Sequence, residues 1–360
     1  MTPQEMAQAV ELARTWDARV TLIRAIASEF GTNLLPEVYS EVAQRVFVPL
    51  LDPDFAFVPI ATEFEPAEFS AAYEAADRLT RRFEDVTPVE LSVAIRSDSR
   101  IIRVLRLIVG FGQQELAAMS LAGGRHALSA SRIKALENGA TASVEEADEC
   151  GGLFDQLMTT RPFGDPPAGW RSKISKPDSE DGWSTVRRLA SAGVPYDVFL
   201  HQRHYGGAFR QLLDSTSSRR GDILEAAVEA VFQERAIPYV RVQSGMQPLV
   251  RERFGIQVSP APDFVVHDAT NHPRAFVECK LANDGGTARD KAARFRALRV
   301  EATRLGGVPV FAVLSGLGWR RTGDALGPVV QATDGRVFTL RTVTELPSVF
   351  PLSSLAGTAT

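Results

Sequence analysis

A glutamate and a lysine interrupt an otherwise apolar run in the C-terminal half of the chain. Glu278 and Lys280 lie within Ala275–Leu281, whose other members are Ala, Phe, Val, Cys and Leu. Side chains alternate between the two faces of a strand, so a strand here points both charged groups the same way. Charged groups on a buried strand are costly unless something compensates them. These two residues are therefore the first candidates for chemistry.

An aspartate is expected to join this pair. Asp263 begins a short predicted strand, Asp263–His267, and the turn Asp268–Pro273 separates it from the charged strand. If the two strands pair across this turn, Asp263 comes close to Glu278. Mg²⁺ binds through one or two carboxylates, several waters and substrate phosphate. Such an ion polarises a phosphoryl oxygen and lowers the pKa of a bound water, while a lysine orients that water or stabilises developing negative charge.

The flanking sequence predicts the elements that position these residues. Asp222–Arg235 carries apolar residues on one helical face, and Thr287–Leu305 is predicted to be an arginine-rich helix. Val308–Leu314 is an apolar run closed by Ser-Gly, which predicts a buried strand. With the two strands above, this order indicates an α/β core with a central mixed sheet.

Pro262-Asp263 followed by Glu278-Cys279-Lys280 resembles the PD-(D/E)xK nuclease superfamily, which includes many restriction endonucleases. The order of the neighbouring elements is also similar to that family: a helix bearing a glutamate upstream, two apolar motif strands, then a basic helix and a buried strand. The resemblance covers a third of the chain. It implies a restriction-endonuclease-like fold and Mg²⁺-dependent hydrolysis of DNA phosphodiester bonds.

The resemblance also implies a role for each matched position. Asp263 and Glu278 are expected to be carboxylate ligands of Mg²⁺, together with the backbone carbonyl of Cys279. Lys280 is expected to orient the attacking water, and Glu225 to be a supporting acid. Three basic residues of the following helix are expected to face the DNA backbone: Arg289, Lys291 and Arg294. The alternatives are an ion pair between glutamate and lysine in an inactive nuclease-like fold and, for the three basic residues, a solvated helix surface.

A second motif lies in the N-terminal half. Leu105–Ala117 followed by Leu128–Gly139 resembles a helix-turn-helix of the phage-repressor/Cro type, through its Gln-x-Glu-Leu-Ala and Ile-x-x-Leu-Glu-Asn-Gly strings. Such a motif presents the start of its second helix to the major groove. The resemblance therefore implies that four residues lie at this exposed start and that two others contact phosphates. The first set is Ser129, Ser131, Arg132 and Lys134, and the second is Arg106 and Gln113.

The connection between the two helices departs from that family. Ser120–Ala127 makes it longer than the family's tight turn, so two packed helices with a surface loop are the alternative. Residues 96–134 carry seven basic and two acidic side chains, and this balance favours DNA contact. Residues 289–304 carry six basic and two acidic side chains, although the whole chain has a net charge of −4.

Helix signals dominate the first 160 residues. Thr2–Glu5 and Thr87–Glu90 each have the pattern of a capping box with proline at the first helical position. The next segment is rich in Pro and Gly, with a short helix expected at Thr185–Ala192. We predict an α+β multi-domain protein with four regions: a mostly α DNA-binding domain at 1–160 containing the helix-turn-helix at 105–139, a linker at 161–218, a nuclease domain at 219–345 and a tail at 346–360.

Composition narrows the class of protein. The chain has 360 residues, 44% hydrophobic and 23% charged, which is long enough for two cores. It has no apolar run of about 18 residues that could span a membrane, and its start lacks a secretion signal. Cys150 and Cys279 are far apart and have no neighbouring Cys/His cluster. We therefore expect neither a disulfide framework nor a zinc site, no membrane partner, and a cytoplasmic location.

Taken together, the two resemblances imply a sequence-specific, Mg²⁺-dependent endonuclease of the type II restriction kind that acts on double-stranded DNA. Cutting both strands with one active site per chain calls for a homodimer. The sequence carries no methyltransferase motif, so a separate cognate DNA methyltransferase is implied. Two alternatives stay open. One is a DNA-binding regulator with an inactive nuclease-like domain, and the other is a defence nuclease for modified or foreign DNA with little sequence preference.

Overall fold

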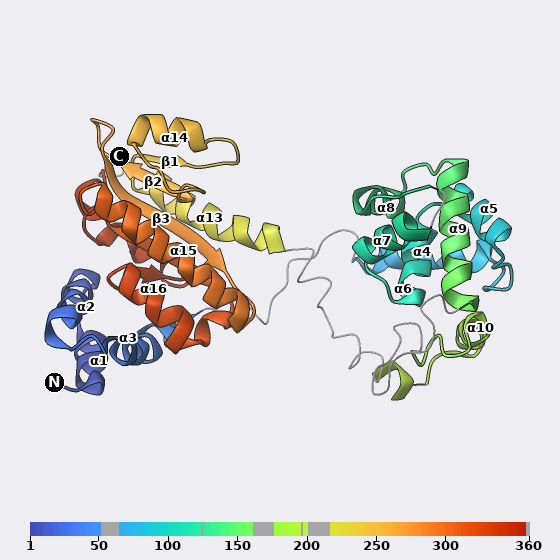
Figure 1. Cartoon of the computed structure of the whole chain (residues 1–360), viewed down its shortest axis with the longest axis horizontal. Helices are drawn as coiled ribbons and strands as arrows, with labels where there is room; N and C mark the ends of the chain where they lie inside the picture. Colours follow the sequence, from blue (N-terminus) through green and yellow to red (C-terminus); the bar gives the residue numbers. More distant parts are fainter. Residues whose placement is uncertain (52–64, 124–125, 161–175, 196, 201–216, 358–360) are drawn as a thin grey trace. The chain divides into compact units, whose positions relative to one another are not determined.

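The chain forms two compact units in the computed structural model (Figure 1), which describes residues 1–51, 65–123, 126–160, 176–195, 197–200 and 217–357. The first unit joins the described residues of 1–59 to those of 216–360, and the second lies within 60–215. This division corrects the prediction of one helical domain over 1–160. None of the described helices is long and apolar enough to cross a membrane.

A mixed sheet organises the first unit. Its described strands lie in the order β1 to β5, antiparallel from β1 to β3 and parallel from β3 to β5. The sequence predicted the three central strands but missed the outer two, which are only three and two residues long. The bounds are β1 Tyr239–Arg241, β2 Phe264–His267, β3 Pro273–Leu281, β4 Val310–Ser315 and β5 Val337–Phe338.

Two long helices flank β3. Helix α13 (Ser217–Glu234) precedes the sheet, and α15 (Gly285–Arg304) is the crossover that the parallel pair β3 and β4 requires. Asp284 caps α15 by accepting a hydrogen bond from the backbone N–H of Thr287 at 2.9 Å. Figure 1 shows α15 in front of β3 and α13 behind it. A short helix, α16 (Gly327–Ala332), links β4 to β5.

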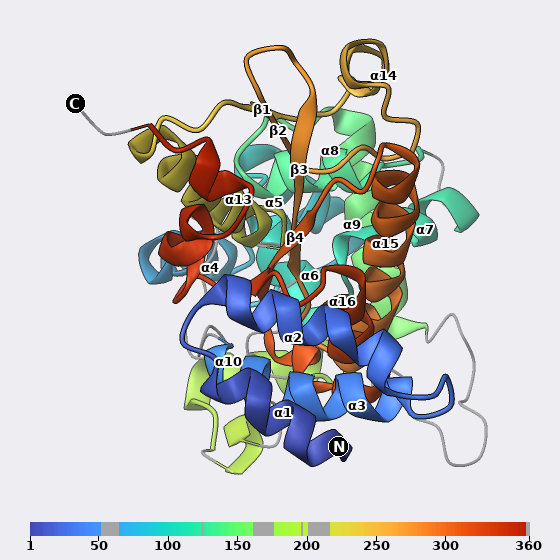
Figure 2. The ribbon, with the colours of Figure 1, turned by 90° about the vertical axis from the view of Figure 1, so that its left-hand side faces the viewer.

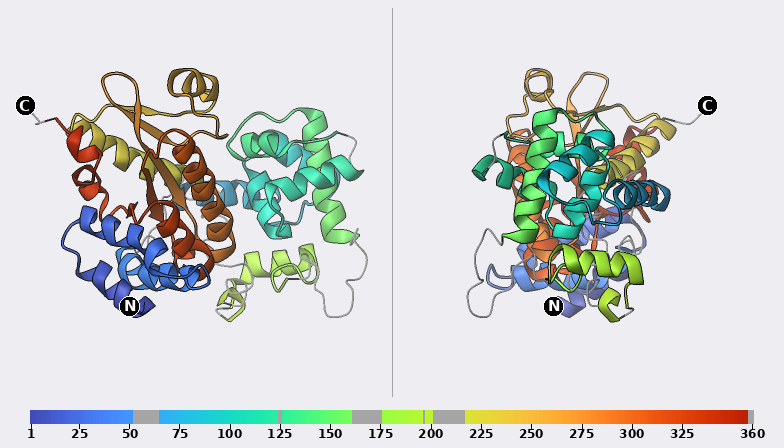
Figure 3. Two further views of the ribbon diagram at one scale, coloured as in Figure 1. Left: turned by 60° about the vertical axis from the view of Figure 1, so that its left-hand side comes forward. Right: turned by 90° about the vertical axis from the view of Figure 1, so that its right-hand side faces the viewer.

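The N-terminal helices belong to this first unit because their apolar faces cover its β5 edge. The ring centroids of Trp16 and Phe338 lie 4.3 Å apart. The Nε1 of Trp16 donates a hydrogen bond to Glu345 Oε2 at 2.7 Å. Figures 2 and 3 show these helices, drawn in blue, beside the red C-terminal elements. The helices are α1 (Pro3–Leu12), α2 (Trp16–Glu29) and α3 (Leu35–Val42).

The C-terminal segment is also part of this core. Val349 and Leu352 are fully buried, and the backbone N–H of Gly357 donates a hydrogen bond to the carbonyl of Arg235 at 3.0 Å. The prediction of a tail at 346–360 is therefore wrong for the described residues up to 357, since apolar side chains anchor them.

Helices make up the described part of the second unit. The capping boxes predicted for α1 and α5 (Pro88–Ser97) are both present. Trp183 and Val186 of α10 (Trp183–Ala192) are buried in this unit's core, so the helix expected within the linker is confirmed, and its residues are not a simple linker. Residues 161–175 and 201–216 lie outside the described residues. The helices are α4 Pro66–Leu79, α5 Pro88–Ser97, α6 Ile101–Val109, α7 Gln113–Gly123, α8 Ala130–Glu137, α9 Val144–Thr159 and α10 Trp183–Ala192.

Replacing Trp16 by alanine tests whether the N-terminal helices stabilise the sheet unit. Trp16 is 5% exposed, so we expect Trp16→Ala to lower the free energy of unfolding of the full chain by about 3–5 kcal/mol in urea denaturation. Leu12→Ala is the control because Leu12 is 70% exposed, and it should cost no more than about 0.5 kcal/mol. Equal costs for the two variants would contradict this packing.

Candidate functional site

The β2–β3 hairpin brings the three predicted residues together. Phe264 pairs with Val277, and extending that register by one residue places Asp263 opposite Glu278. Asp263 Oδ2 accepts hydrogen bonds from the backbone N–H of Cys279 at 2.7 Å and from Lys280 Nζ at 3.2 Å. Lys280 Nζ lies 2.7 Å from Glu278 Oε1. The lysine therefore bridges the two carboxylates.

Burial shapes the charges of this cluster. The exposed fraction of the Glu278 side chain is 1%, against 22% for Asp263 and 24% for Lys280. Burial raises the pKa of Asp263 to about 6, and the negative charge of Glu278 adds to this rise. Burial also acts to lower the pKa of Lys280, but Glu278 and Asp263 outweigh it, so this pKa is raised. The lysine stays an ammonium group at neutral pH.

Arg294 reaches this cluster from α15. Its Nε lies 2.9 Å from Glu278 Oε1 and its terminal nitrogen 3.3 Å from Oε2, and its side chain is only 12% exposed. The expected contact of Arg294 with the DNA backbone conflicts with this pairing, because the buried carboxylate needs the partner. Lys291 donates a hydrogen bond to the carbonyl of Leu281, whereas Arg289 is 61% exposed beside Asp290.

Glu225 pairs with a different residue. Its Oε2 accepts hydrogen bonds from Arg241 of β1 at 3.0 and 3.2 Å, and no hydrogen bond or ion pair joins it to Asp263, Glu278 or Lys280. Sequence reasoning did not identify Arg241, and it gave Arg294 a different role, because each of them pairs with a carboxylate 16 residues away. An arginine on a helix or strand beside the motif is the only signal the sequence carries for them.

Backbone groups complete the cluster. The carbonyl of Cys279, expected to be a metal ligand, accepts a hydrogen bond from Lys280 Nζ at 3.0 Å. The fully buried Trp319 donates from its Nε1 to the carbonyl of Lys280 at 3.2 Å. This hydrogen bond fixes the backbone at the end of β3, and it therefore fixes the position from which the Lys280 side chain extends.

The donor set of this site suits a hard, hydrated cation. No group of three or more His, Cys, Asp or Glu side chains that could hold a metal occurs among the described residues. Asp263 and Glu278 offer two carboxylates, which is the number that Mg²⁺ uses when waters and substrate phosphate supply the other ligands. The residues therefore fit Mg²⁺ completed by substrate.

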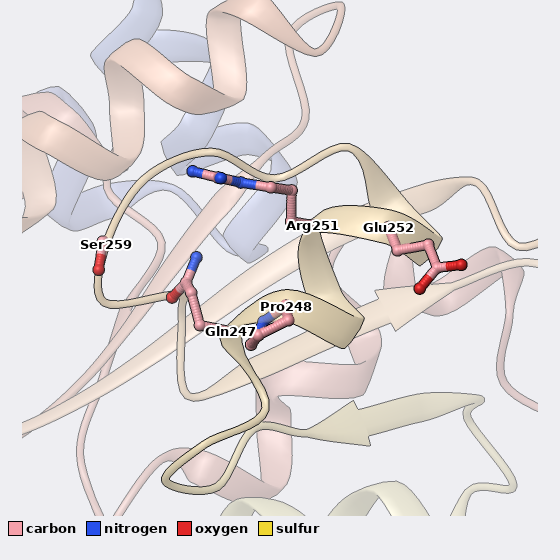
Figure 4. Close-up of a pocket in the computed structure, with 5 residues that line it drawn as sticks. All are labelled: Gln247, Pro248, Arg251, Glu252 and Ser259. Carbon is pink, nitrogen blue, oxygen red and sulfur yellow. The ribbon is translucent and has the colours of Figure 1, made fainter.

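A pocket of about 340 Å³ lies elsewhere on the first unit, around α14 (Gln247–Phe254). Figure 4 shows Arg251 and Gln247 of this helix on the side toward Ser259. The pocket contains none of the residues predicted from the sequence to do chemistry. Its lining residues are Gln247, Pro248, Arg251, Glu252 and Ser259.

The two helices of the predicted helix-turn-helix are present as α7 and α8. Leu116, Ile133 and Leu136 are fully buried where these helices pack, as expected. Ser129 caps α8 by accepting a hydrogen bond from the backbone N–H of Arg132 at 3.1 Å. Three of the predicted DNA-reading residues are exposed: Ser129, Ser131 and Lys134.

Arg106 and Gln113 both bond a buried carboxylate inside the second unit. Arg106 donates to both carboxylate oxygens of Glu137 and to the carbonyl of Phe111 at 2.8 Å. Gln113 Nε2 donates to the same carboxylate. Glu137 is 2% exposed, and a buried carboxylate without a partner would be strongly destabilising. The expected phosphate contacts of these two side chains conflict with this pairing.

Arg132 is likewise engaged by its own unit. Its Nε and a terminal nitrogen lie 2.6 and 2.7 Å from the two oxygens of Glu146, and it also donates to the carbonyl of Thr141 at 2.8 Å. The hydrogen bond from Arg132 lowers the pKa of Glu146 to about 2. The expected base-reading role of Arg132 conflicts with this bidentate pair.

Comparison with known proteins adds no relative. No family model matches the chain, and no curated protein or solved structure matches it either.

The raised pKa of Asp263 predicts a pH dependence of stability. Between the ordinary value of 3.8 and about 6, the folded chain binds more protons at this group than the unfolded chain does. The group's contribution to the unfolding free energy therefore falls as pH rises through that window. Asp263→Asn should remove this fall in urea denaturation at several pH values. Asp290→Asn, at an exposed carboxylate, should leave it, and an unchanged slope in Asp263→Asn would refute the assignment.

The Arg132–Glu146 pair predicts a structural effect of Arg132. We expect Arg132→Ala to lower the free energy of unfolding by about 1–2 kcal/mol, since a partly exposed, bidentate charged pair is lost. Lys134→Ala, on the exposed face of α8, should be milder in the same thermal and urea measurements. If Arg132→Ala kept full stability but changed the DNA site selected from random sequences, the arginine would be a base reader after all.

Proposed function

We propose that the chain is a Mg²⁺-dependent endodeoxyribonuclease of the type II restriction kind, hydrolysing phosphodiester bonds of double-stranded DNA. One observation carries this proposal: Asp263, Glu278 and Lys280 converge on one face of the β2–β3 hairpin within the mixed sheet. Two carboxylates that each lie within hydrogen-bonding distance of one ammonium group are costly to bury. A role in phosphodiester hydrolysis would explain why the chain keeps these buried charges.

Each residue then has a chemical task. Asp263 and Glu278 would hold Mg²⁺, which supplies a water of lowered pKa and polarises the scissile phosphate when bound. Lys280 bridges both carboxylates, so its ammonium group can orient a water between them or stabilise the charge that develops on phosphate. Arg289 is exposed on the first turns of α15 and can neutralise the DNA backbone.

The second unit supports a role in DNA recognition. The exposed start of α8 offers Ser129, Ser131 and Lys134. Hydroxyl and ammonium groups at a helix start can bond base edges and phosphates. We propose double-stranded DNA as the partner, a homodimer as the cutting form, and a separate methyltransferase that protects the host site.

A DNA-binding regulator with an inactive nuclease-like unit is the second candidate. The observation that favours it is the double neutralisation of Glu278 by Lys280 and Arg294. Such a network would stabilise the fold without any reaction. The two candidates differ in one result, since both bind DNA but only the nuclease cuts it.

Removing either carboxylate tests the proposed function. With Mg²⁺ and unmethylated plasmid or phage DNA, we expect the wild-type chain to produce discrete fragments. Asp263→Asn and Glu278→Gln should reduce cleavage by a factor on the order of 10³ or more, while binding of the same DNA in a gel-shift assay persists. Lys280→Met should slow cleavage by roughly 10²–10³-fold, as loss of a transition-state contact does.

Asp268→Asn is the matched control, because Asp268 lies in the turn between β2 and β3 and bonds only residues of that turn region. It should cut like the wild type. Cleavage at the wild-type rate by Asp263→Asn would refute the site. DNA binding without any cleavage by the wild type would favour the regulator, and a smear in place of bands would favour a nuclease with little sequence preference.

A further inference from the structure

Arg294 has a contact pattern that differs from that of Lys280. Among the residues that the structure describes, its side chain bonds Glu278 alone, at 2.9 Å to Oε1 and 3.3 Å to Oε2. The ammonium group of Lys280 instead contacts three groups: Glu278, Asp263 and the carbonyl of Cys279. Arg294 therefore engages both oxygens of the most deeply buried carboxylate in the site, and it does so from a different element.

The charges of the four ionisable side chains of the site sum to zero. Asp263 and Glu278 carry two negative charges, and Lys280 and Arg294 carry two positive ones. Their side-chain exposed fractions are 22%, 1%, 24% and 12%, so solvent screens them only weakly. A divalent cation that approaches this cluster meets no net negative charge, and it is repelled by the guanidinium group on one of its two carboxylate ligands.

We infer that Arg294 is a positioning residue: it holds Glu278 in place without metal and keeps the affinity for a divalent cation low until a substrate phosphate adds negative charge. The inference rests on the proposed nuclease function. Its physical basis is that a phosphodiester contributes the negative charge that the protein, with Arg294 in place, lacks. Metal and DNA would then bind together, and the enzyme would not hold an active metal centre while it is free of DNA.

Titration of the full-length chain with Mg²⁺ alone, without DNA, tests this role by calorimetry. We expect Arg294→Gln to bind Mg²⁺ at least about tenfold more tightly than the wild type, because one buried positive charge next to the ligand is gone. Arg294→Lys keeps the charge and should keep the low affinity. Arg296→Gln is the matched control, since Arg296 is exposed on the same helix and its loss changes the net charge equally.

The variant should fold, because Glu278 retains Lys280 at 2.7 Å after Arg294 is lost. Circular dichroism without metal checks this, and Arg294→Met provides a second neutral replacement of similar length. The inference is wrong if Arg294→Gln and Arg294→Met bind Mg²⁺ no more tightly than the wild type. It is also wrong if Arg296→Gln raises the affinity as much as they do.

Its failure can be told apart from failure of the proposed function. A wild-type chain that cuts DNA through Asp263 and Glu278, with unchanged Mg²⁺ affinity in Arg294→Gln, refutes the inference alone. A wild-type chain that never cuts, with no Mg²⁺ binding in any variant, refutes both.

Discussion

The buried carboxylate of Glu278 is the constraint on which the first unit depends. An ionised group that is 1% exposed requires charged or hydrogen-bonding partners, and here they come from Lys280 on the same strand and Arg294 on α15. The β3 strand and the crossover helix must therefore keep one relative position. The loop after β4 approaches the end of β3 closely as well: Gly316 has φ +104°, and a Cβ there would lie 2.1 Å from the carbonyl oxygen of Ala282. That approach lets Trp319 reach the backbone of Lys280.

The second unit also contains a buried carboxylate that requires partners. Glu137 at the end of α8 is 2% exposed, and Arg106 of α6 and Gln113 of α7 converge on it. One carboxylate thus ties three helices together. An arginine of the predicted helix-turn-helix can bind phosphate or compensate a buried acid, but one guanidinium group cannot do both at full strength. In this unit Arg106 pairs with the buried Glu137, and Arg132 pairs with Glu146, which is also buried.

A third buried acid joins the two ends of the chain within the first unit. Asp334 Oδ2 lies 3.0 Å from Arg24 of α2, 3.0 Å from Arg299 of α15 and 3.2 Å from Arg336. Arg24 is 310 residues away in sequence. Together with the packing of Trp16 on the β5 edge, this contact gives the N-terminal helices their place beside the sheet. These contacts explain why the N-terminal helices belong to the sheet unit although their sequence is as helical as that of the second unit.

Local patterns in the sequence determined the central elements and the core of the candidate site. Alternation and turn residues predicted β2, β3 and β4, capping boxes predicted the starts of α1 and α5, and the short hairpin connection placed Asp263 beside Glu278 and Lys280. These features depend on residues that are neighbours in the chain, so they can be predicted without tertiary contacts. Only the tertiary structure decided the partners of Arg294, Arg106 and Arg132 and the position of the N-terminal helices. Each of these depends on where a buried carboxylate or an apolar edge lies in space, which the periodicity of a single segment does not encode.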